Sequence, residues 1–489
     1  MDLNKFASTC DKAINASDID KIKQLITKAS NKVKLDETPD NIKAIYLYYI
    51  GNLHSAASKI QKESWHRWRE QVYPSHKVQT INAYRTSLLL LQEFSNSPIL
   101  NEIRTNLANE ITDQRRSIEA FEIWSHDFSS PGDAPFVSTA AKIRELIYLH
   151  YYINDPGHAK SYIFSAYNLL NTLEENISES SHPGIINLLQ YDKDIKNLRD
   201  FGLKCSKEDL SWDSTPPTKY SKSEKKYRQW CLENRLFVNH LNDITKSDIA
   251  DQDILQFPNY TSSYREGPYF SAAFSSLKRE YCFARFLAYE GFHKVHPKYE
   301  NKNLYLVDTL DYVNYEGYTE KLKTSLRICF SIFDSTAQLL NKYYGLEKSK
   351  QVAFTPRDLR KCTPDKTNPF LSALFWLSCD LYDIDLSKKS NNWEAPNPSS
   401  SAFRKIRNSC EHGWLRVADG SFDAWGNEND YAQIISSESL SKYTLELLKL
   451  VRSALIYFCL TIKFEESENS TENSTKEELT LHRATPIYK

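Results

Sequence analysis

The chain has 489 residues and a formal net charge of −1 at pH 7, with 26% charged and 40% hydrophobic residues. This composition excludes an intrinsically disordered protein and a uniformly basic nucleic-acid coat, although a local basic patch is compatible with a neutral total. The length exceeds what one hydrophobic core usually supports, so we expect two or three domains. Only 12 residues are glycine, which favours long helices over many short strands joined by tight turns.

The cysteines and the hydropathy pattern predict a cytoplasmic protein. Nine cysteines are scattered singly, without the C-x-x-C pair that would indicate a zinc ribbon or a dithiol redox site. An odd number of isolated cysteines is typical of the reducing cytosol. The N-terminal segment lacks the apolar run of a signal peptide, and no stretch approaches the ~20 apolar residues that cross a bilayer. We therefore expect no contact with a membrane.

Residues 1–205 are predicted to form a domain of helical repeats. In residues 42–60 and 78–94, apolar side chains recur every three or four positions, as in helices that pack on one side. Residues 105–133 resemble the helix–turn–helix of a tetratricopeptide repeat, which has ~34 residues. The positions that carry this pattern are Leu107, Ala108, Ile111, Ala120 and Trp124, with Pro131 near the closing turn. Its neighbours, such as the one around Gly51, are degenerate, so an irregular helical bundle is the alternative.

Residues 206–300 are predicted to connect these repeats to a second domain. Two prolines within residues 212–220 mark a loop at the boundary. The cluster of Lys, Arg and Tyr from Lys219 to Trp230 suits either a linker or an RNA-binding strip. Residues 275–292 are predicted to form a helix with three aromatic side chains on one side, Phe283, Phe286 and Tyr289.

Residues 301–466 are predicted to form a bundle of four helices, which makes the fold class all-α. The helices are expected from Glu316 to Gly345 and at residues 368–383, 403–417 and 439–462. Gly345 is well placed to end the first of them, because glycine tolerates the left-handed conformation of a helix C-terminus. Residues 467–489 are polar and are expected to form a flexible tail.

The segment from Arg407 to His412, Arg-Asn-Ser-Cys-Glu-His, combines two side chains suited to RNA cleavage. The arginine guanidinium is permanently charged and presents forked donors that match a phosphate. The histidine titrates near physiological pH and can take the proton from a ribose 2′-hydroxyl. Together they suffice for cleavage without a metal, which leaves a 2′,3′-cyclic phosphate and a 5′-hydroxyl.

The spacing of this motif is not specific by itself. Two other pairs in the chain have the same or nearly the same spacing, Arg235 with His240 and Arg144 with His150. Without a catalytic role, Arg407 would form an ion pair with Glu411 one helical turn away. His412 would then be a hydrogen-bonded histidine inside the bundle. The spacing alone leaves both interpretations open.

Seven segments in the same order resemble a bacterial branch of the HEPN superfamily (higher eukaryote and prokaryote nucleotide-binding) that carries tetratricopeptide-like repeats before its HEPN domain. They cover residues 105–120, 227–244, 276–291, 306–323, 332–346, 368–381 and 407–417. HEPN ribonucleases are helical bundles with an arginine, a polar residue after it, and a histidine a few positions later. The resemblance implies that Arg407 and His412 are the catalytic pair and that Asn408 is the polar residue beside the arginine.

The resemblance also implies an activity and partners. It implies a metal-independent endoribonuclease without a cofactor, acting as a toxin-like effector in anti-phage defence or abortive infection. HEPN ribonucleases commonly act as homodimers with two motifs facing one cleft. Because positions five apart on a helix differ by ~140° around its axis, such a cleft would collect Arg407 from one protomer and His412 from the other. The repeats would bind a protein trigger or regulator, as repeat surfaces usually do.

Four polar residues are candidates for orienting the catalytic pair. Glu411 precedes the histidine, and Asp380 lies on the second helix of the bundle within a resembling segment. Asn341, on the first helix of the bundle, is a candidate of the same standing as Asp380, whereas Asp383 is expected to lie on a solvated polar face. Without such a role, each would belong to a solvated polar face.

Basic and aromatic residues near the motif are candidates for binding RNA. Arg404, Lys405 and Arg416 are candidates for contacting phosphates, although such charges more often belong to a solvated helix face. Trp414 and Trp376 are candidates for stacking on a base, although tryptophans in a helical bundle more often belong to the core.

Two other functions are open at this point. The chain would be a non-catalytic scaffold, or a module that binds a nucleotide or protein, if Arg407 and His412 formed a polar network at a dimer interface. The environment of His412 would distinguish this from an enzyme. A metal-dependent nuclease is not indicated, because no pattern of clustered carboxylates and histidines stands out.

Overall fold

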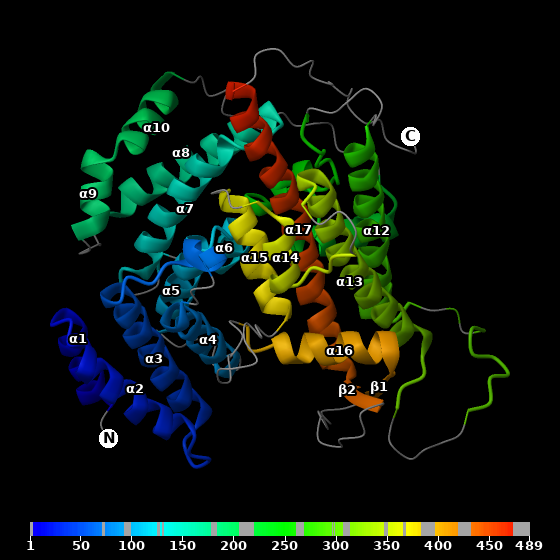
Figure 1. Cartoon of the computed structure of the whole chain (residues 1–489), viewed down its shortest axis with the longest axis horizontal. Helices are drawn as coiled ribbons and strands as arrows, with labels where there is room; N and C mark the ends of the chain where they lie inside the picture. The colour runs from blue at the N-terminus through cyan, green and yellow to red at the C-terminus, as the bar shows by residue number, and fades with distance from the viewer. Residues whose placement is uncertain are drawn as a thin grey trace.

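A computed structural model describes residues 3–70, 74–91, 99–124, 128–129, 132–177, 183–204, 220–260, 268–295, 297, 299–306, 313–346, 351–364, 368–382, 397–418 and 432–472. Helices form nearly all of the regular structure in this part of the chain, together with one pair of short strands (Figure 1). The all-α fold class is therefore confirmed.

The N-terminal helices pack on their neighbours in chain order. They are α1 (Leu3–Asn15), α2 (Ile19–Val33), α3 (Asp40–Ile60), the 3₁₀ helix η1 (Trp65–Glu70), α4 (Ser75–Leu90), α5 (Ile99–Asp113), α6 (Ser117–Ile123), α7 (Ala134–His150), α8 (Pro156–Asn176), α9 (Pro183–Tyr191) and α10 (Lys193–Lys204). The helices predicted at residues 42–60 and 78–94 correspond to α3 and α4.

The expected tetratricopeptide unit corresponds to α5 and α6. The side chains of its pattern are buried, as a packed repeat requires: Leu107, Ala108, Ile111, Ala120 and Trp124. However, α6 has only 7 residues and ends at Ile123, so the second helix is much shorter than the pattern predicts. Pro131 lies outside the described residues. The tetratricopeptide-like character of the N-terminal part stays a prediction.

α3 and α4 approach each other closely at Gly51. A Cβ atom added to Gly51 would lie 2.3 Å from Cε1 of Tyr84. The ring cannot retreat easily, because Tyr84 is buried and its hydroxyl donates to Oδ1 of Asn52 at 2.7 Å. The absence of a side chain at Gly51 therefore allows the contact between these helices.

We expect Gly51→Ala to lower the free energy of unfolding by about 1–2 kcal/mol. Overpacking costs about 1–3 kcal/mol, and a severe clash outweighs the gain of roughly 0.5–1 kcal/mol from replacing a helical glycine with alanine. Urea unfolding followed by circular dichroism measures the change. Adding Tyr84→Leu should recover part of the loss, whereas a Gly51→Ala variant as stable as the parent would contradict the close approach.

The connecting region and the C-terminal part complete the chain. Their elements are α11 (Lys222–Glu233), the 3₁₀ helices η3 (His240–Asp243) and η4 (Asp248–Ala250), α12 (Tyr269–Phe292), α13 (Gly317–Tyr344), α14 (Pro356–Cys362), α15 (Pro369–Leu381), α16 (Ser400–His412), β1 (Trp414–Ala418), β2 (Ala432–Ser436) and α17 (Ser437–Glu472). The predicted helix from Glu316 to Gly345 is confirmed as α13. Gly345 has φ +66° and its N–H donates to the carbonyl of Asn341 at 2.8 Å, which ends the helix.

α17 is the central helix of the C-terminal part. It packs against α12, α13 and α15, and residues 450–462 are buried (Figure 1). A helix that is buried on all sides has no polar face, so this stretch is mostly apolar, and its buried Arg452 forms an ion pair with Asp243 at 2.7 Å. α17 continues to Glu472, beyond the end predicted at residue 462.

The predicted helix at residues 403–417 is too long. α16 ends at His412, Gly413 adopts an extended conformation, and β1 follows directly. β1 pairs with β2 in parallel, with Trp414 opposite Ala432 and Ala418 opposite Ser436. The aromatic and β-branched residues of β1 favour a strand once a partner is present. The motif therefore lies at the C-terminal end of its helix.

The N-terminal helices and the C-terminal part share one continuous hydrophobic core. At their contact the Trp65 and Trp376 rings meet edge to face at 4.5 Å, and Trp68 stacks on Phe375 at 4.2 Å. Because these rings are buried, apolar packing holds the two parts together.

Candidate active site

Arg407 lies on α16 and points toward α13 and the residue that follows α15. The neighbouring Phe403 is buried and anchors this face of α16. Nη2 of Arg407 donates to Oδ2 of Asp334 at 2.6 Å, and Nη1 donates to the hydroxyl of Tyr382. The guanidinium carbon lies 5.6 Å from the ring centre of Phe330. Two hydrogen bonds and an aromatic face thus fix the orientation of the guanidinium.

Asp334 and Tyr382 are the site residues that sequence reasoning misses. They are 73 and 25 residues away from Arg407 along the chain. Asp334 is itself held, because its Oδ1 accepts the N–H of Phe354 at 2.9 Å. A signal for Asp334 exists in the sequence, since it lies within the resembling segment at residues 332–346. The ion-pair partner of Arg407 is thus Asp334, rather than a residue on its own helix.

The charges of this site are only partly shielded from water. The side chains of Arg407 and Asp334 are 23% and 30% exposed, so the guanidinium can reach a ligand from solvent. Burial raises the pKa of Tyr382, the charge of Arg407 opposes this rise, and Asp334 and Glu411 add to it. Tyr382 therefore keeps its proton at neutral pH and accepts from Arg407 as a neutral hydroxyl.

The end of α16 carries the rest of the motif. Nε of Arg327 donates to the carbonyl of Cys410 at 3.1 Å, and a positive charge there is favoured by the helix dipole. Burial raises the pKa of Cys410 to about 11, so its thiol is not a nucleophile at neutral pH. Asn408 and Glu411 are exposed. His412 is the last residue of the helix, and its side chain lies outside what the structure describes.

Asp380 does not lie at this site, which corrects the expectation that it orients the catalytic pair directly. It is fully buried on α15, and its oxygens accept from Arg85 and Arg116 at 2.7 Å each. Both arginines belong to the N-terminal helices. Asn341 is buried near the end of α13, and Asp383 lies outside the described residues.

The candidates for RNA binding differ in their exposure to solvent. Arg404 is exposed, whereas Lys405 and Arg416 are half-buried, and each of the three already has an interaction partner. Trp376 is buried and its Nε1 donates to a backbone carbonyl at 3.1 Å, so it belongs to the core. Trp414 is 73% exposed on β1, two residues after the motif histidine. Trp414 is therefore the tryptophan available to stack on a base.

The basic and aromatic cluster that ends at Trp230 splits into two parts. Its lysines on α11 are exposed at residues 222, 225 and 226. Its aromatic rings pack on α12 instead, with Tyr227 5.4 Å from Phe286 and Trp230 5.6 Å from Phe292. The aromatic half of this cluster thus joins two helices, while the lysines face solvent.

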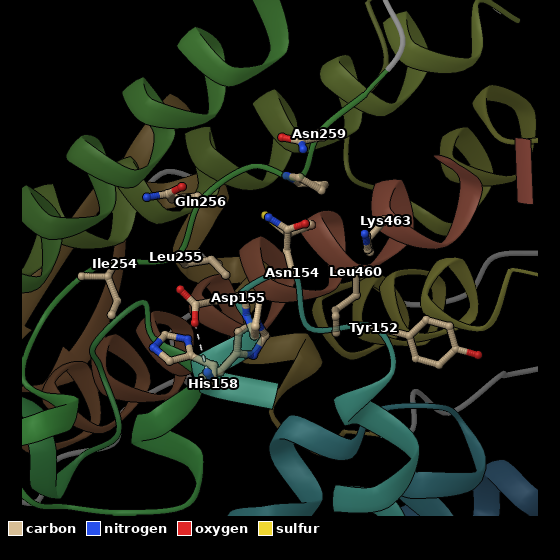
Figure 2. A pocket seen from close by; sticks show the side chains of 14 residues that line it. Tyr152, Asn154, Asp155, His158, Ile254, Leu255, Gln256, Asn259, Leu460 and Lys463 are labelled. Carbon is tan, nitrogen blue, oxygen red and sulfur yellow. Dashed lines mark hydrogen bonds between the residues drawn. The ribbon is translucent and has the colours of Figure 1, made fainter. Parts of the chain in front are cut away.

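His240, of the alternative pair Arg235–His240, lies away from this site. It lines a cavity of about 300 Å³ that is bounded by the N-terminal helices, the connecting region and α17. Figure 2 shows that Asp155 and Lys463 belong to this cavity from different elements. Burial, together with His158 and Arg452, lowers the pKa of His240 to about 3. Such a weak base is unsuited to take a proton from a hydroxyl at neutral pH. The pair Arg235–His240 is therefore unsuited to this proton transfer.

The described residues contain neither a cluster suited to a metal ion nor a helix suited to span a membrane. In the part of the chain that the structure describes, no group of three or more His, Cys, Asp or Glu side chains is arranged to hold a metal ion. Within the same residues, no helix combines the length and apolar character needed to span a bilayer.

Comparison with known proteins identifies one domain. Residues 261–465 match the family model described as LA2681-like HEPN. The match covers α12 to α17 and contains Asp334, Tyr382 and Arg407, and it begins before the predicted boundary at residue 301. The chain thus has a C-terminal HEPN domain, which points to a nuclease or RNA-related function, because this class generally includes ribonucleases that bind RNA and dimerise. No curated protein and no solved structure matches the chain significantly.

Proposed function

We propose that the protein is a metal-independent endoribonuclease that cleaves RNA by attack of the ribose 2′-hydroxyl on the adjacent phosphate. The observation that supports this most is the setting of Arg407: a partly exposed guanidinium, fixed by Asp334 and Tyr382, on a helix that ends at His412 within a HEPN domain. A cation oriented in advance at a surface open to solvent is suited to stabilise charge on a phosphate.

The hydrogen bonds of Arg407 leave donors for a substrate. A guanidinium has five N–H groups, and among the described residues one on Nη1 and one on Nη2 are occupied. The remaining N–H groups bind phosphate oxygens, while His412 takes the proton of the 2′-hydroxyl. As the 2′-oxygen bonds to phosphorus, the bond from phosphorus to the 5′-oxygen breaks, and the departing oxygen receives the proton that His412 has taken, directly or through water. The products are a 2′,3′-cyclic phosphate and a 5′-hydroxyl.

The first test is cleavage of RNA by the full-length protein in EDTA, with analysis of the product ends. We expect cutting with cyclic phosphate and 5′-hydroxyl ends. The matched control is the Arg407→Ala/His412→Ala double variant, purified in the same way to reveal contaminating nucleases. Cutting by the double variant, or products with 5′-phosphate ends, would contradict the proposal.

We also propose that the active form is a homodimer formed through the HEPN domain. The guanidinium of Arg407 is directed at α13 and α15 of its own chain, and His412 lies ~140° further around the helix axis. A cleft between two protomers brings an arginine and a histidine together despite this angle. Mixing inactive Arg407→Ala and His412→Ala proteins tests this, because a heterodimer would regain one complete site. No recovery of activity at any mixing ratio would argue for a site within one protomer.

We infer the biological role from the resemblance to HEPN ribonucleases. A toxin-like effector in anti-phage defence would cut cellular RNA, and the N-terminal helices would bind the protein that triggers or restrains it. The alternative is a non-catalytic scaffold or a nucleotide- or protein-binding module, which is favoured by the ion pair that already occupies Arg407. RNA cleavage dependent on His412 distinguishes the two, since a scaffold does not need the proton-transfer group.

We expect Trp414→Ala to weaken RNA binding by about 1–3 kcal/mol, because base stacking on an exposed aromatic ring contributes this much. The stability of the fold should be nearly unchanged, since most of the side chain is in water. Fluorescence anisotropy with an uncleavable 2′-O-methyl RNA measures the dissociation constant. Trp414→Phe should keep most of the affinity, and an alanine variant that binds as tightly as the parent would rule out stacking.

A further inference from the structure

Asp380 connects the N-terminal helices to the C-terminal domain. The Nη1 and Nη2 groups of Arg85 on α4 donate to its two oxygens at 2.7 and 2.8 Å. Arg116, just before α6, adds an ion pair at 2.7 Å. Asp380 and Arg116 are fully buried, and the Arg85 side chain is 15% exposed. A carboxylate that is buried between two arginines from another part of the chain fixes the position of its own helix.

The anchored residue lies close to the candidate active site along the chain. α15 ends at Leu381, one residue after Asp380, and Tyr382 follows in an extended conformation. The N–H of Tyr382 still donates to the carbonyl of Ser378 at 3.1 Å, so its backbone is tied to the last turn of α15. Its hydroxyl accepts from Arg407. A displacement of Asp380 would therefore move the last turn of α15 and the backbone of Tyr382. The hydroxyl of Tyr382, which contacts the guanidinium of Arg407, would move with it.

Other contacts hold the same side of this region. Trp376 donates from Nε1 to the carbonyl of Trp65 at 3.1 Å, and Phe375 stacks on Trp68. Arg69 donates to the carbonyl of Thr363 at 3.1 Å, in the segment that precedes α15. The N-terminal helices thus contact α15 and the segment before it at several points, while Tyr382, just after the end of α15, contacts Arg407.

We propose that the N-terminal helices set the orientation of Arg407 through α15, with Arg85 and Asp380 as positioning residues and Tyr382 as the contact that transmits their position. The proposal rests on the ribonuclease activity proposed above. It gives the N-terminal helices a part in assembling the active site itself. A partner that shifts α4 would change the rate of cleavage without touching RNA.

A double-mutant cycle between Arg85 and Tyr382 tests this link. Arg85→Lys keeps a positive charge beside Asp380 but loses the forked pair of hydrogen bonds, and Tyr382→Phe removes the acceptor for Arg407. We expect each substitution to lower kcat by about 10- to 100-fold with little change in KM, as small misplacements of catalytic groups do. Because both act on the same contact, the double variant should be no slower than the slower single variant.

The control cycle pairs Arg85→Lys with Trp414→Ala. Trp414 lies on β1 and does not share a contact with Arg85 or Tyr382 among the described residues. Measured as kcat/KM, the loss of turnover from Arg85→Lys and the loss of RNA affinity from Trp414→Ala should therefore multiply. If the Arg85 and Tyr382 effects also multiply, or if Arg85→Lys changes only the melting temperature, the proposal is wrong. A role in stability alone would lower the melting temperature and leave the two rate effects independent.

Crystal structures of the parent and of Arg85→Lys provide a readout that does not need activity. We expect the hydrogen bond between Arg407 and Tyr382 to be broken or displaced in the variant, while α13 and Asp334 stay in place. An unchanged contact would overturn the positioning role even if the enzyme cleaves RNA. A displaced contact in a protein that does not cleave RNA would support the link and refute the proposed activity separately.

Discussion

Replacing His412 by alanine is expected to reduce RNA cleavage by about 10²–10⁴-fold, the usual contribution of a general base. Arg407→Ala should cost a similar factor, about 10²–10³-fold, because it removes the cation that stabilises charge on the phosphate. Arg407→Lys should not restore the rate, since an ammonium cannot satisfy Asp334, Tyr382 and a phosphate with a planar fork. Initial rates on a fluorescent RNA substrate measure all three.

These losses should appear without loss of the fold. The ion pair between Arg407 and Asp334 is partly exposed, and such pairs contribute only about 0–1 kcal/mol. The matched control is the other near-match in the chain, Arg144→Ala with His150→Ala, which should cleave RNA at the parental rate. If the control variant loses as much activity as the motif variants, the assignment of the catalytic pair fails.

The second large effect is expected on the free energy of unfolding when Asp380 is replaced by alanine. Asp380→Ala removes the carboxylate that Arg85 and Arg116 share, which leaves Arg116 with Glu119 as its ion-pair partner and takes away the ion pair of Arg85. Removing one partner of a buried ion pair costs about 3–5 kcal/mol, so the variant should unfold at much lower urea concentration. Asp334→Ala is the comparison, because its partly exposed ion pair contributes about 0–1 kcal/mol and the lost acceptor for the N–H of Phe354 adds about 1 kcal/mol, so the total loss should be smaller than for Asp380→Ala. Equal stability losses in the two variants would contradict the burial of Asp380.

The same carboxylate predicts part of the acid sensitivity of the protein. Burial alone would raise the pKa of Asp380, but Arg116 and Arg85 outweigh it and hold the pKa below its ordinary value. Its contribution to stability is therefore complete above the unfolded-state pKa of about 3.9 and is lost as the pH falls through the lower folded-state value. Urea unfolding between pH 6 and pH 3 should show a shallower pH dependence for Asp380→Asn than for the parent. Parallel pH profiles would exclude this contribution.

Local sequence signals predict the long helices of the C-terminal domain well. α13 begins and ends within one or two residues of the predicted helix, because its apolar positions follow the helical period and Gly345 can adopt the left-handed conformation. α17 is also recognisable, although it extends ten residues further than its apolar stretch to Glu472. The α16 helix is less well predicted, since the choice between helix and strand after Gly413 depends on pairing with β2.

The candidate active site also combines features that the sequence predicts with features that only the fold determines. The sequence by itself determined the chemistry that Arg407 and His412 can offer and the helix that carries them, because side-chain type and helical period are local properties. Only the tertiary structure decided that Asp334 and Tyr382 hold the guanidinium, since hydrogen-bond partners 73 and 25 residues apart are chosen by how helices pack. It also decided that Asp380 binds the N-terminal arginines. A buried carboxylate must find positive partners, and here Arg85 on α4 and Arg116 just before α6 supply them.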